Sequence, residues 1–582
     1  MKRSLIFITL IILAVAIDSA AQQSPGRAKA ITGRVVSDSG QPVANATIYL
    51  NKVGVRQGPG VSTSTDEQGG FRTDDLDNGA YWVNAMVPGF VSTNETAEPQ
   101  FNRPGDSITF HMTKGGVITG AVTTSVGEPV VAARVRAIKV REIDGRPPRR
   151  GANIQERATD DRGIYRLYGL QSGVYVVAVT GRTMFGFAAP SLYEGDAPTY
   201  YPSSTRDAAA EVTVRAGDEA SGIDIRYRGD RGHAVSGTVA GSVEGNQQMA
   251  GVSVWLAHAS NGVTEAQEFI PVRGNNRSFA LYGVPDGEYE ITARRGAQAD
   301  GASSVPRRVT VKGADVTGLE LVLAPNSSIA GNVIMEPLKE SERKPECGDK
   351  RQVMIEEIVV TARRDDKDSK ERARPFSRSD STPNSKGEFA IFNLRAGLFR
   401  INTGFPGEGW YVRSMNLLAA ASAGKPKVVA RDAARLGLQL NQGERLTGLT
   451  ITIAEGAASI AGKVLPAKEG ERLASQVRIH LAPAEPESKD DALRYREVMA
   501  DADGDFAIAS LAPGRYFILA REVAETSAAE DEPRPAGWDE ATRAAIRREA
   551  EAVNQTIELQ PCKRVADYSV RVAAAKPAAK KQ

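Results

Sequence analysis

The sequence has few of the side chains that most often carry catalysis or bind metals. Its 582 residues include two cysteines and four histidines. No histidine has a glutamate three residues further on, and neither a His-Glu-x-x-His nor a Gly-x-Ser-x-Gly motif occurs. Two distant cysteines give no support to a cysteine nucleophile either. We therefore predict a non-enzymatic protein without a metal or other cofactor.

The chain also lacks an excess of one charge. It has 73 basic and 71 acidic residues, which gives a formal net charge of +2. A balance this close provides no electrostatic footprint for nucleic acid or for an anionic membrane surface. We expect neither of them as a partner.

One apolar run, residues 5–17, stands at the N-terminus. It follows Lys2 and Arg3 and precedes the small residues Ser19, Ala20 and Ala21. This order predicts a signal peptide over residues 1–21, with a retained anchor as the alternative. We expect export to the periplasm, the outer-membrane surface or the extracellular space, with no transmembrane span after cleavage.

The two cysteines, Cys347 and Cys562, lie far apart in the sequence. In an exported chain two cysteines can form one disulfide. Such a bond would link two domains, whereas the alternative is a pair of unrelated thiols.

Glycine and proline are abundant, with 56 and 30 residues, and favour turns and short strands over long helices. The length suggests about four to six domains. Five segments share a pattern that opens with Gly-x-Val and later places an aromatic residue, Leu or Val five residues on, and a second aromatic ten residues on. The sets are Phe71/Leu76/Tyr81, Tyr165/Leu170/Tyr175, Phe279/Val284/Tyr289, Phe389/Leu394/Phe399 and Phe506/Leu511/Tyr516.

Each of these blocks predicts two strands joined by a corner. The residues after the first aromatic alternate apolar and polar, as expected for a half-buried strand. A turn such as "PDG" or "APG" follows, and the second aromatic begins the next strand. We interpret the aromatics as core residues, because each pair would bury a large apolar area.

The Gly-x-Val opening, the Asp-rich turn and the L-x-x-G-x-Y corner resemble the carboxypeptidase regulatory-like domain of bacterial secreted proteins. The resemblance implies a prealbumin-like β-sandwich within a carbohydrate-binding-like fold group. The third segment departs from the pattern, with Ser278 in place of the first glycine. We therefore predict an all-β tandem array of about five antiparallel sandwiches. The expected domains are residues 30–114, 116–231, 233–325, 327–456 and 458–572.

Two segments depart from the repeats. Residues 537–553 lack internal glycine and proline and predict one helix, packed on the last sandwich. Residues 573–582 are small and basic and predict a disordered tail. The acidic run from Asp501 to Asp505 resembles the start of a calcium loop, but Ala512 stands where the bidentate glutamate would be, which favours a simple turn.

Two aromatic segments outside the core pattern are candidates for carbohydrate binding, because sugars dock on exposed aromatic faces beside polar groups. One is an insertion in the second repeat and the other a stretch in the fourth. In either case the alternative is that the segment packs on its own sandwich. The candidate residues are Phe185, Phe187, Tyr193, Tyr200 and Tyr201 in the first, and Trp410 and Tyr411 in the second.

The stretch "IEEIVVTARR", within residues 352–367, looks like the segment at the head of many TonB-dependent outer-membrane receptors. The rest of the chain is too short for the barrel of such a receptor. Its place in the repeat predicts the second strand of the fourth sandwich. If that strand lies at a sheet edge, Glu356 and Glu357 would protect the edge from pairing.

These observations together predict an exported binding or scaffold protein whose partner is a polysaccharide or a cell-envelope protein. One alternative is a structural stalk or adhesion rod. Another is an accessory to a TonB-dependent receptor, which rests on fold analogy alone.

Overall fold

The computed structural model describes most of residues 29–573. The signal peptide and nearly all of the tail predicted from the sequence lie outside the described residues, as do Phe185 and Phe187. The described ranges are 29–54, 60–92, 101–145, 155–181, 191–241, 251–259, 264–270, 277–296, 301–342, 345–347, 351–365, 378–418, 430–468, 470–471, 473, 476–501, 503–523 and 534–573.

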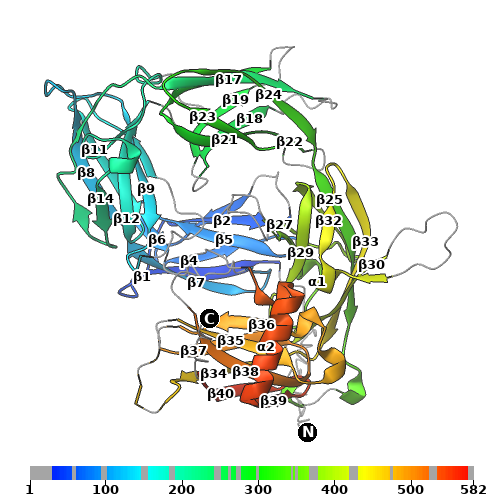
Figure 1. Ribbon diagram of the computed structural model, residues 1–582. Helices are drawn as coiled ribbons and strands as arrows, with labels where there is room; N and C mark the ends of the chain where they lie inside the picture. Colours follow the sequence, from blue (N-terminus) through cyan, green and yellow to red (C-terminus); the bar gives the residue numbers. More distant parts are fainter. Residues whose placement is uncertain are drawn as a thin grey trace, which may run out of the picture.

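The described residues form five β-modules in a row, which confirms the predicted fold class (Figure 1). The first module has sheets β4-β1-β7-β6 and β3-β2-β5, and the second has β11-β8-β15 with β16, and β10-β9-β12-β13 with β14. Their strands are β1 (Ile31–Ser37), β2 (Thr47–Lys52), β3 (Val61–Ser64), β4 (Gly70–Thr73), β5 (Tyr81–Met86), β6 (Phe90–Ser92), β7 (Ser107–Lys114), β8 (Gly116–Thr123), β9 (Arg134–Arg141), β10 (Gln155–Ala158), β11 (Ile164–Leu170), β12 (Gly173–Thr180), β13 (Thr199–Tyr200), β14 (Glu211–Val214), β15 (Glu219–Ala220) and β16 (Ile225–Arg226).

In the third module β22 pairs with both β21 and β24, so the strands form one continuous sheet, β19-β18-β21-β22-β24-β17-β20 with β23 on β21. Its strands are β17 (His233–Ala240), β18 (Val252–His258), β19 (Thr264–Ile270), β20 (Ser278–Val284), β21 (Gly287–Arg295), β22 (Ala302–Ser304), β23 (Arg307–Val311) and β24 (Val316–Pro325).

The fourth and fifth modules return to two separate sheets each. The fourth has β28-β25-β33-β30-β31 and β27-β26-β29-β32, and the fifth has β37-β34-β40 and β36-β35-β38-β39. Their elements are β25 (Ser327–Glu336), β26 (Val359–Arg364), β27 (Arg378–Ser381), β28 (Glu388–Leu394), β29 (Gly397–Gly404), β30 (Trp410–Leu418), β31 (Ala430–Asp432), α1 (Ala433–Leu436), β32 (Leu438–Leu440), β33 (Arg445–Glu455), β34 (Ala458–Leu465), β35 (Val477–Pro483), β36 (Arg496–Met499), β37 (Asp505–Leu511), β38 (Gly514–Glu522), α2 (Glu540–Val553), β39 (Thr556–Leu559) and β40 (Arg564–Arg571).

The first strand of every module pairs with two equivalent strands, and β8 also pairs with β15. The first strand pairs antiparallel with the strand of the first repeat aromatic, and parallel with the last strand of the module. Parallel pairing requires a long crossover, which here is the rest of the module. The sandwiches are therefore not purely antiparallel, in contrast to the prediction. The parallel pairs are β1 with β7, β8 with β16, β17 with β24, β25 with β33 and β34 with β40.

The glycine of each Gly-x-Val motif lies directly opposite the first aromatic, as Gly462 lies opposite Phe506. A Cβ on Gly462 would stand 1.8 Å from the Tyr568 carbonyl oxygen of the parallel last strand. The corresponding distances are 2.1 Å at Gly33, 2.1 Å at Gly120, 1.9 Å at Gly237 and 2.1 Å at Gly331. The motif therefore keeps a side chain away from the place where the backbone of the last strand approaches most closely.

A β-bulge explains why the aromatic and the following Leu or Val are five residues apart. Side chains alternate along a strand, so an odd spacing would place one of the two outside. In β11 the pairing with β8 shifts between Tyr168 and Leu170, and Gly169 has φ +72°. The extra residue returns Leu170 to the core beside Tyr165 and Leu167. The other repeats have Asp75, Gly283, Asn393 and Ser510 at this place, all with positive φ.

The second aromatic closes the corner with its hydroxyl. Tyr81, Tyr175, Tyr289 and Tyr516 each donate to the carbonyl four residues earlier, at distances of 2.9, 2.7, 2.9 and 2.7 Å. Burial raises the pKa of Tyr516 to about 12. The fourth repeat has Phe399 here and lacks this bond. These aromatics are core residues, as predicted.

The Asp-rich turns fix the start of the strand that carries the first aromatic. One side-chain oxygen of Asp501 accepts from the backbone N–H groups of Asp503 and Asp505, at 3.0 and 2.8 Å. Asp66, Asp160 and Asn384 make the same pair of bonds in their own repeats. The acidic run at Asp501 is therefore built as a turn of the repeat.

Helix α2 packs across the outer face of the last sandwich, where Figure 1 shows it over β36, β35 and β38. It begins after Asp539, whose carboxylate accepts from the Thr542 N–H at 3.0 Å. Because residues 536–538 form a 3-10 turn, the helix is three residues shorter than predicted. Ile546 and Ala550 pack against an apolar outer face of the sheet formed by Ala482, Phe517 and Leu519.

Successive modules meet at joints of one design. The N–H of the residue just before or at the start of each new module donates to the carbonyl of a glycine in the preceding one. At the first three joints the residue with positive φ at the bulge lies against this contact: a Cβ on Gly115 would be 2.6 Å from the Gly169 Cα. The four bonds run from Gly115 to Gly89 (2.8 Å), Gly232 to Gly195 (3.0 Å), Asn326 to Gly301 (2.8 Å) and Gly456 to Gly409 (2.8 Å).

The joints are short, as the adjoining domain bounds predict. The five modules nevertheless do not form an extended row. Figure 1 shows the first module, with β1–β7, in the middle, the second and third above it, and the fourth returning along its side. The fifth module lies below. No helix of the described residues is long and apolar enough to cross a membrane.

We predict that Gly462→Ala destabilises the fifth module, because the new Cβ would collide with the Tyr568 carbonyl. Overpacking of this kind costs roughly 1–3 kcal/mol or more. The thermal unfolding midpoint should fall clearly. Gly407→Ala is the control, since its Cβ would meet nothing closer than 3.6 Å; equal midpoints for the two variants would contradict the prediction.

Candidate functional site at the module interfaces

The described part of the second module's insertion, from residue 191 onward, packs on its own sandwich. Tyr200, on β13, is 3% exposed and contacts Val176 and Ala178. Tyr193 lies edge-on against Tyr227, with ring centroids 5.4 Å apart. Tyr201 is half-buried against the same core. Tyr200 therefore lacks the exposed face that a sugar platform requires, and the alternative interpretation of this segment fits the described residues better.

Trp410 is likewise a core residue. It is 7% exposed and belongs to the core of the fourth module, while Tyr411 is half-buried. Neither forms the open aromatic platform that the sequence suggested. Part of Trp410 does, however, line a cavity between the fourth and fifth modules.

The stretch that resembles a TonB-dependent receptor segment is built differently from the prediction. Residues 355–357 form a 3-10 turn, and only Val359–Arg364 form a strand, β26. This strand lies between β27 and β29 and is not an edge. Glu356 and Glu357 precede it, so the idea that they protect an edge is wrong. Ile358 and Val360 point into the core of the fourth module.

Glu357 instead binds the first module. Its side chain is 1% exposed, and one oxygen lies 2.9 Å from an Arg103 guanidinium nitrogen. The other oxygen lies 2.7 Å from Arg351 of the fourth module. Asp106 is 3.6 Å from Arg103 and 3.7 Å from Arg351, so two arginines and two acids meet across the interface. We call these four residues the return cluster.

Apolar side chains surround the return cluster. Val359, the first residue of β26, is 1% exposed and packs with Val53 and Ala80 of the first module. Trp82 and Phe101 adjoin them, with ring centroids 4.6 Å apart. The interface therefore combines an apolar patch with a charge cluster in which Glu357 and Arg103 are buried.

The fourth and fifth modules meet through a second buried cluster. Asp365, directly after β26, has a fully buried carboxylate 2.9 Å from Arg400. Arg534 of the fifth module donates to the same carboxylate at 3.1 Å. Arg400 also donates to the Trp538 carbonyl at 2.8 Å. Arg435 of α1 pairs with Glu540 of α2 at 3.2 Å, so the helix region ties the two modules together.

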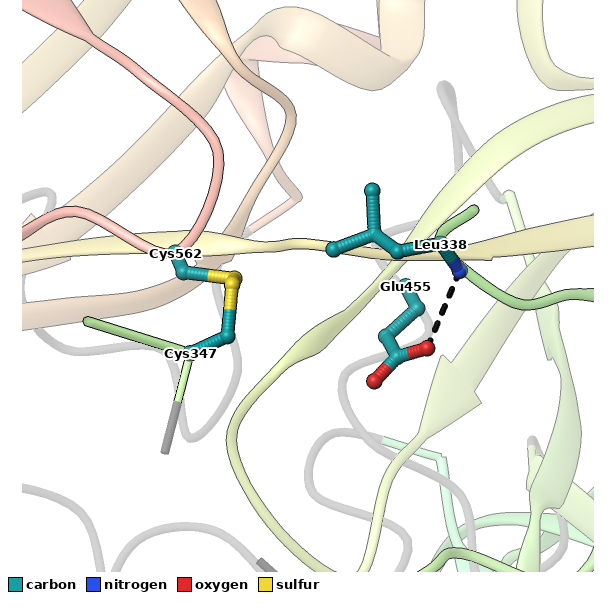
Figure 2. The surroundings of a disulfide bond; sticks show 4 residues. All are labelled: Leu338, Cys347, Glu455 and Cys562. Atoms are coloured by element: carbon teal, nitrogen blue, oxygen red, sulfur yellow. Dashed lines mark hydrogen bonds between the residues drawn. A yellow bond between two sulfur atoms is a disulfide. The ribbon is translucent and has the colours of Figure 1, made fainter. Parts of the chain in front are cut away.

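A disulfide reinforces this junction. Figure 2 shows Cys347 and Cys562 bonded, with an S–S distance of 2.02 Å, close to Glu455. Cys347 lies in a 3-10 turn after β25, and Cys562 lies between β39 and β40. The bond thus links the fourth module to the fifth. The Cys562 N–H donates to the Gly456 carbonyl at 3.0 Å, which fixes one half of the pair at the joint.

The histidines do not converge on one site. His111 lies in the first module, His233 and His258 in the third, and His480 in the fifth. His480 is 2% exposed, with Nδ1 3.2 Å from Glu497 and Nε2 accepting from Arg521 at 3.1 Å. Burial lowers the pKa of His480 and favours the neutral ring. Within the described ranges, no three His, Cys, Asp or Glu residues are grouped as metal ligands would be.

Apart from the two cysteines, the residues that join the modules could not be found from the sequence. Arg103 and Glu357 are 254 residues apart, and Arg534 and Asp365 are 169 apart. Neither pair belongs to a motif with a fixed spacing. The local signal at this interface was the pair Glu356 and Glu357, which the sequence suggested would protect a sheet edge.

Part of the chain matches a known family. Residues 30–112 match the family model of the carboxypeptidase regulatory-like domain. This range covers the first module from just before β1 into β7, and it confirms there the resemblance that the repeat pattern suggested. A search of the curated proteins finds no match.

Distant likeness to solved structures extends further along the chain. The minor pilin GBS52 of Streptococcus agalactiae is 15% identical over 34% of this chain and 96% of its own, with a TM-score of 0.18. Two B repeat units of the Staphylococcus aureus collagen-binding protein are 12% identical over 73% and 99%, with a TM-score of 0.13. The Bacillus anthracis TIE protein is 12% identical over 73% of each chain, with a TM-score of 0.14. Likeness at this level says nothing of a shared ligand or arrangement.

Acid should loosen the junction at Asp365. Burial alone would raise the pKa of Asp365, but hydrogen bonds from Arg534 and Arg400 outweigh it and hold the pKa below its usual range. The stabilisation is therefore complete above the unfolded-state pKa of about 4 and is lost as the pH falls through the lower folded-state pKa. We expect the unfolding midpoint to drop more between pH 5 and pH 3 in the natural protein than in Asp365→Asn.

The exposed Asp74→Asn variant serves as the control for this comparison, and its pH dependence should match that of the natural protein. Asp365→Asn itself should be less stable at pH 7 by roughly 3–5 kcal/mol, because it leaves the buried Arg400 and the partly buried Arg534 without a carboxylate. Parallel pH curves for Asp365→Asn and the natural protein would contradict the assignment.

The disulfide makes a separate prediction. The unreduced mature protein should contain no titratable thiol, and reduction should expose two. Because the bond links two modules, reduction should increase hydrogen exchange at the 345–347 turn and around Cys562 while leaving the first three modules unchanged. Two thiols before reduction, measured in denaturant with a thiol reagent, would show that the bond does not form in solution.

Proposed function

We propose that the protein is an exported, non-enzymatic scaffold that binds a polysaccharide or a protein of the cell envelope. It would act in the periplasm, at the outer-membrane surface or outside the cell. The observation that carries the proposal is the return of the fourth module to the first through the buried Arg103–Glu357 pair. A chain closed in this way holds several module surfaces in a fixed mutual arrangement, which suits binding to an extended partner.

The same contact weighs against the two alternatives. A stalk or adhesion rod gains length from each module, and modules that fold back add little. An accessory to a TonB-dependent receptor would need to offer the "IEEIVV" stretch, but Glu357, Ile358, Val359 and Val360 are all buried. The non-enzymatic assignment is supported by the dispersed histidines, whose side chains serve separate modules.

The closed arrangement can be tested by Glu357→Arg. A third arginine would then take the buried place of Glu357 beside Arg103 and Arg351, and like charges at this distance repel. We expect the radius of gyration and the maximum dimension from small-angle X-ray scattering to increase, because the fourth module separates from the first. The adjacent Glu356→Arg is the matched control and should leave the scattering unchanged. Identical scattering for the natural protein and Glu357→Arg would refute a closure that depends on this pair.

Binding is tested with the natural protein immobilised and exposed to envelope fractions. Retention of polysaccharide, or of a protein that survives treatment with glycosidases, supports the proposal. Recovery of neither supports a purely structural stalk. If the closed arrangement matters for binding, Glu357→Arg should retain less of the partner than Glu356→Arg.

A further inference from the structure

A cavity of about 490 Å3 lies beside the disulfide, where the fourth and fifth modules meet. Met335 and Trp410 come from the fourth module, while Ser459 and Cys562 come from the fifth. Figure 2 shows the disulfide and Glu455, which belong to its walls. Neither module alone could form this space, so it exists only because the joint, the disulfide and the Asp365 cluster hold the modules together.

The charges in the cavity walls cancel. The lining residues include two arginines, Arg351 and Arg564, and two glutamates, Glu408 and Glu455. Arg564 pairs with Glu408 across the two modules at 3.0 Å, and Arg351 pairs with Glu357 at 2.7 Å. Glu455 accepts from the Leu338 N–H at 3.0 Å. A ligand with a net charge would meet no uncompensated partner here, so the walls favour a neutral one.

The walls also offer donors and acceptors beside an aromatic ring. Gln352, Ser459 and Ser510 can both donate and accept, the arginines only donate, and the glutamates only accept. Hydroxyl groups need both kinds of partner. Trp410 and Val353 supply apolar surface next to these groups. A few polar groups around an aromatic surface are typical of sites for small polar ligands.

We propose that this cavity binds a neutral, hydroxyl-rich ligand, such as sugar units of an uncharged polysaccharide. The proposal rests on the binding function proposed above and specifies its ligand class and its place. It moves the candidate site away from Tyr200 and the second module and retains only Trp410 from the sequence-based set. Because both modules build the walls, the affinity depends on the disulfide.

The test uses the full-length protein and a panel of neutral tetrasaccharides (maltotetraose, cellotetraose, xylotetraose and chitotetraose), with an acidic uronic-acid tetrasaccharide for comparison. Binding is followed by saturation-transfer NMR and titration calorimetry. At least one neutral sugar should bind. Ser459→Trp fills the cavity without removing Trp410 and should weaken that binding by about tenfold or more. Reduction of the disulfide should also weaken it.

Ser328→Trp is the matched control. Ser328 occupies the same position in the first strand of the fourth module, where its N–H donates to the Glu444 carbonyl as that of Ser459 donates to the Lys563 carbonyl. This variant should bind the sugar as the natural protein does. Binding of the acidic sugar alone, equal binding by Ser459→Trp and the natural protein, or binding of no neutral sugar would each overturn the proposal. Failure here combined with retention of an envelope partner would leave the scaffold function standing and remove only this site.

Discussion

A backbone hydrogen bond at each joint sets how successive modules are oriented. The N–H at the start of a module donates to a glycine carbonyl of the one before, and at the first three joints the residue with positive φ at the repeat's bulge also packs against the contact. Buried backbone groups must be paired, so this geometry tolerates little change. The same device recurs at the four joints described here, and the path bends until the fourth module reaches the first (Figure 1).

Two charge clusters between modules add to the orientation that the joints set. Buried ion pairs seldom add net stability, because removing the charges from water costs nearly as much as their attraction returns. Their effect is selective: another docking of the modules would take Arg103 away from Glu357 and Arg534 away from Asp365, and would leave each acid with one arginine of its own module. The return cluster and the Asp365 cluster therefore favour one arrangement over the alternatives. The disulfide adds a covalent link at the second of these interfaces.

The repeat was predictable because it is local. Strand alternation, the aromatic positions and the corner turns all depend on residues within about ten positions of one another, and the core aromatics Tyr165 and Phe389 lie where expected. The predicted sugar platform failed at Tyr200 and Trp410 for the opposite reason. Whether an aromatic outside a repeat is exposed depends on what covers it, and that cover comes from residues distant in the sequence.

The amino-acid sequence alone determined the number and type of modules, because each spacing reflects a strand, a bulge or a turn that forms within one module. The sequence also shows directly that it contains neither a His-Glu-x-x-His nor a Gly-x-Ser-x-Gly motif. Only the tertiary structure decided that "IEEIVV" joins the fourth module to the first, and that Trp410 borders a cavity shared by two modules. Contacts between modules leave no periodic trace in the chain, since Arg103 and Glu357 meet only after each surrounding sandwich has folded.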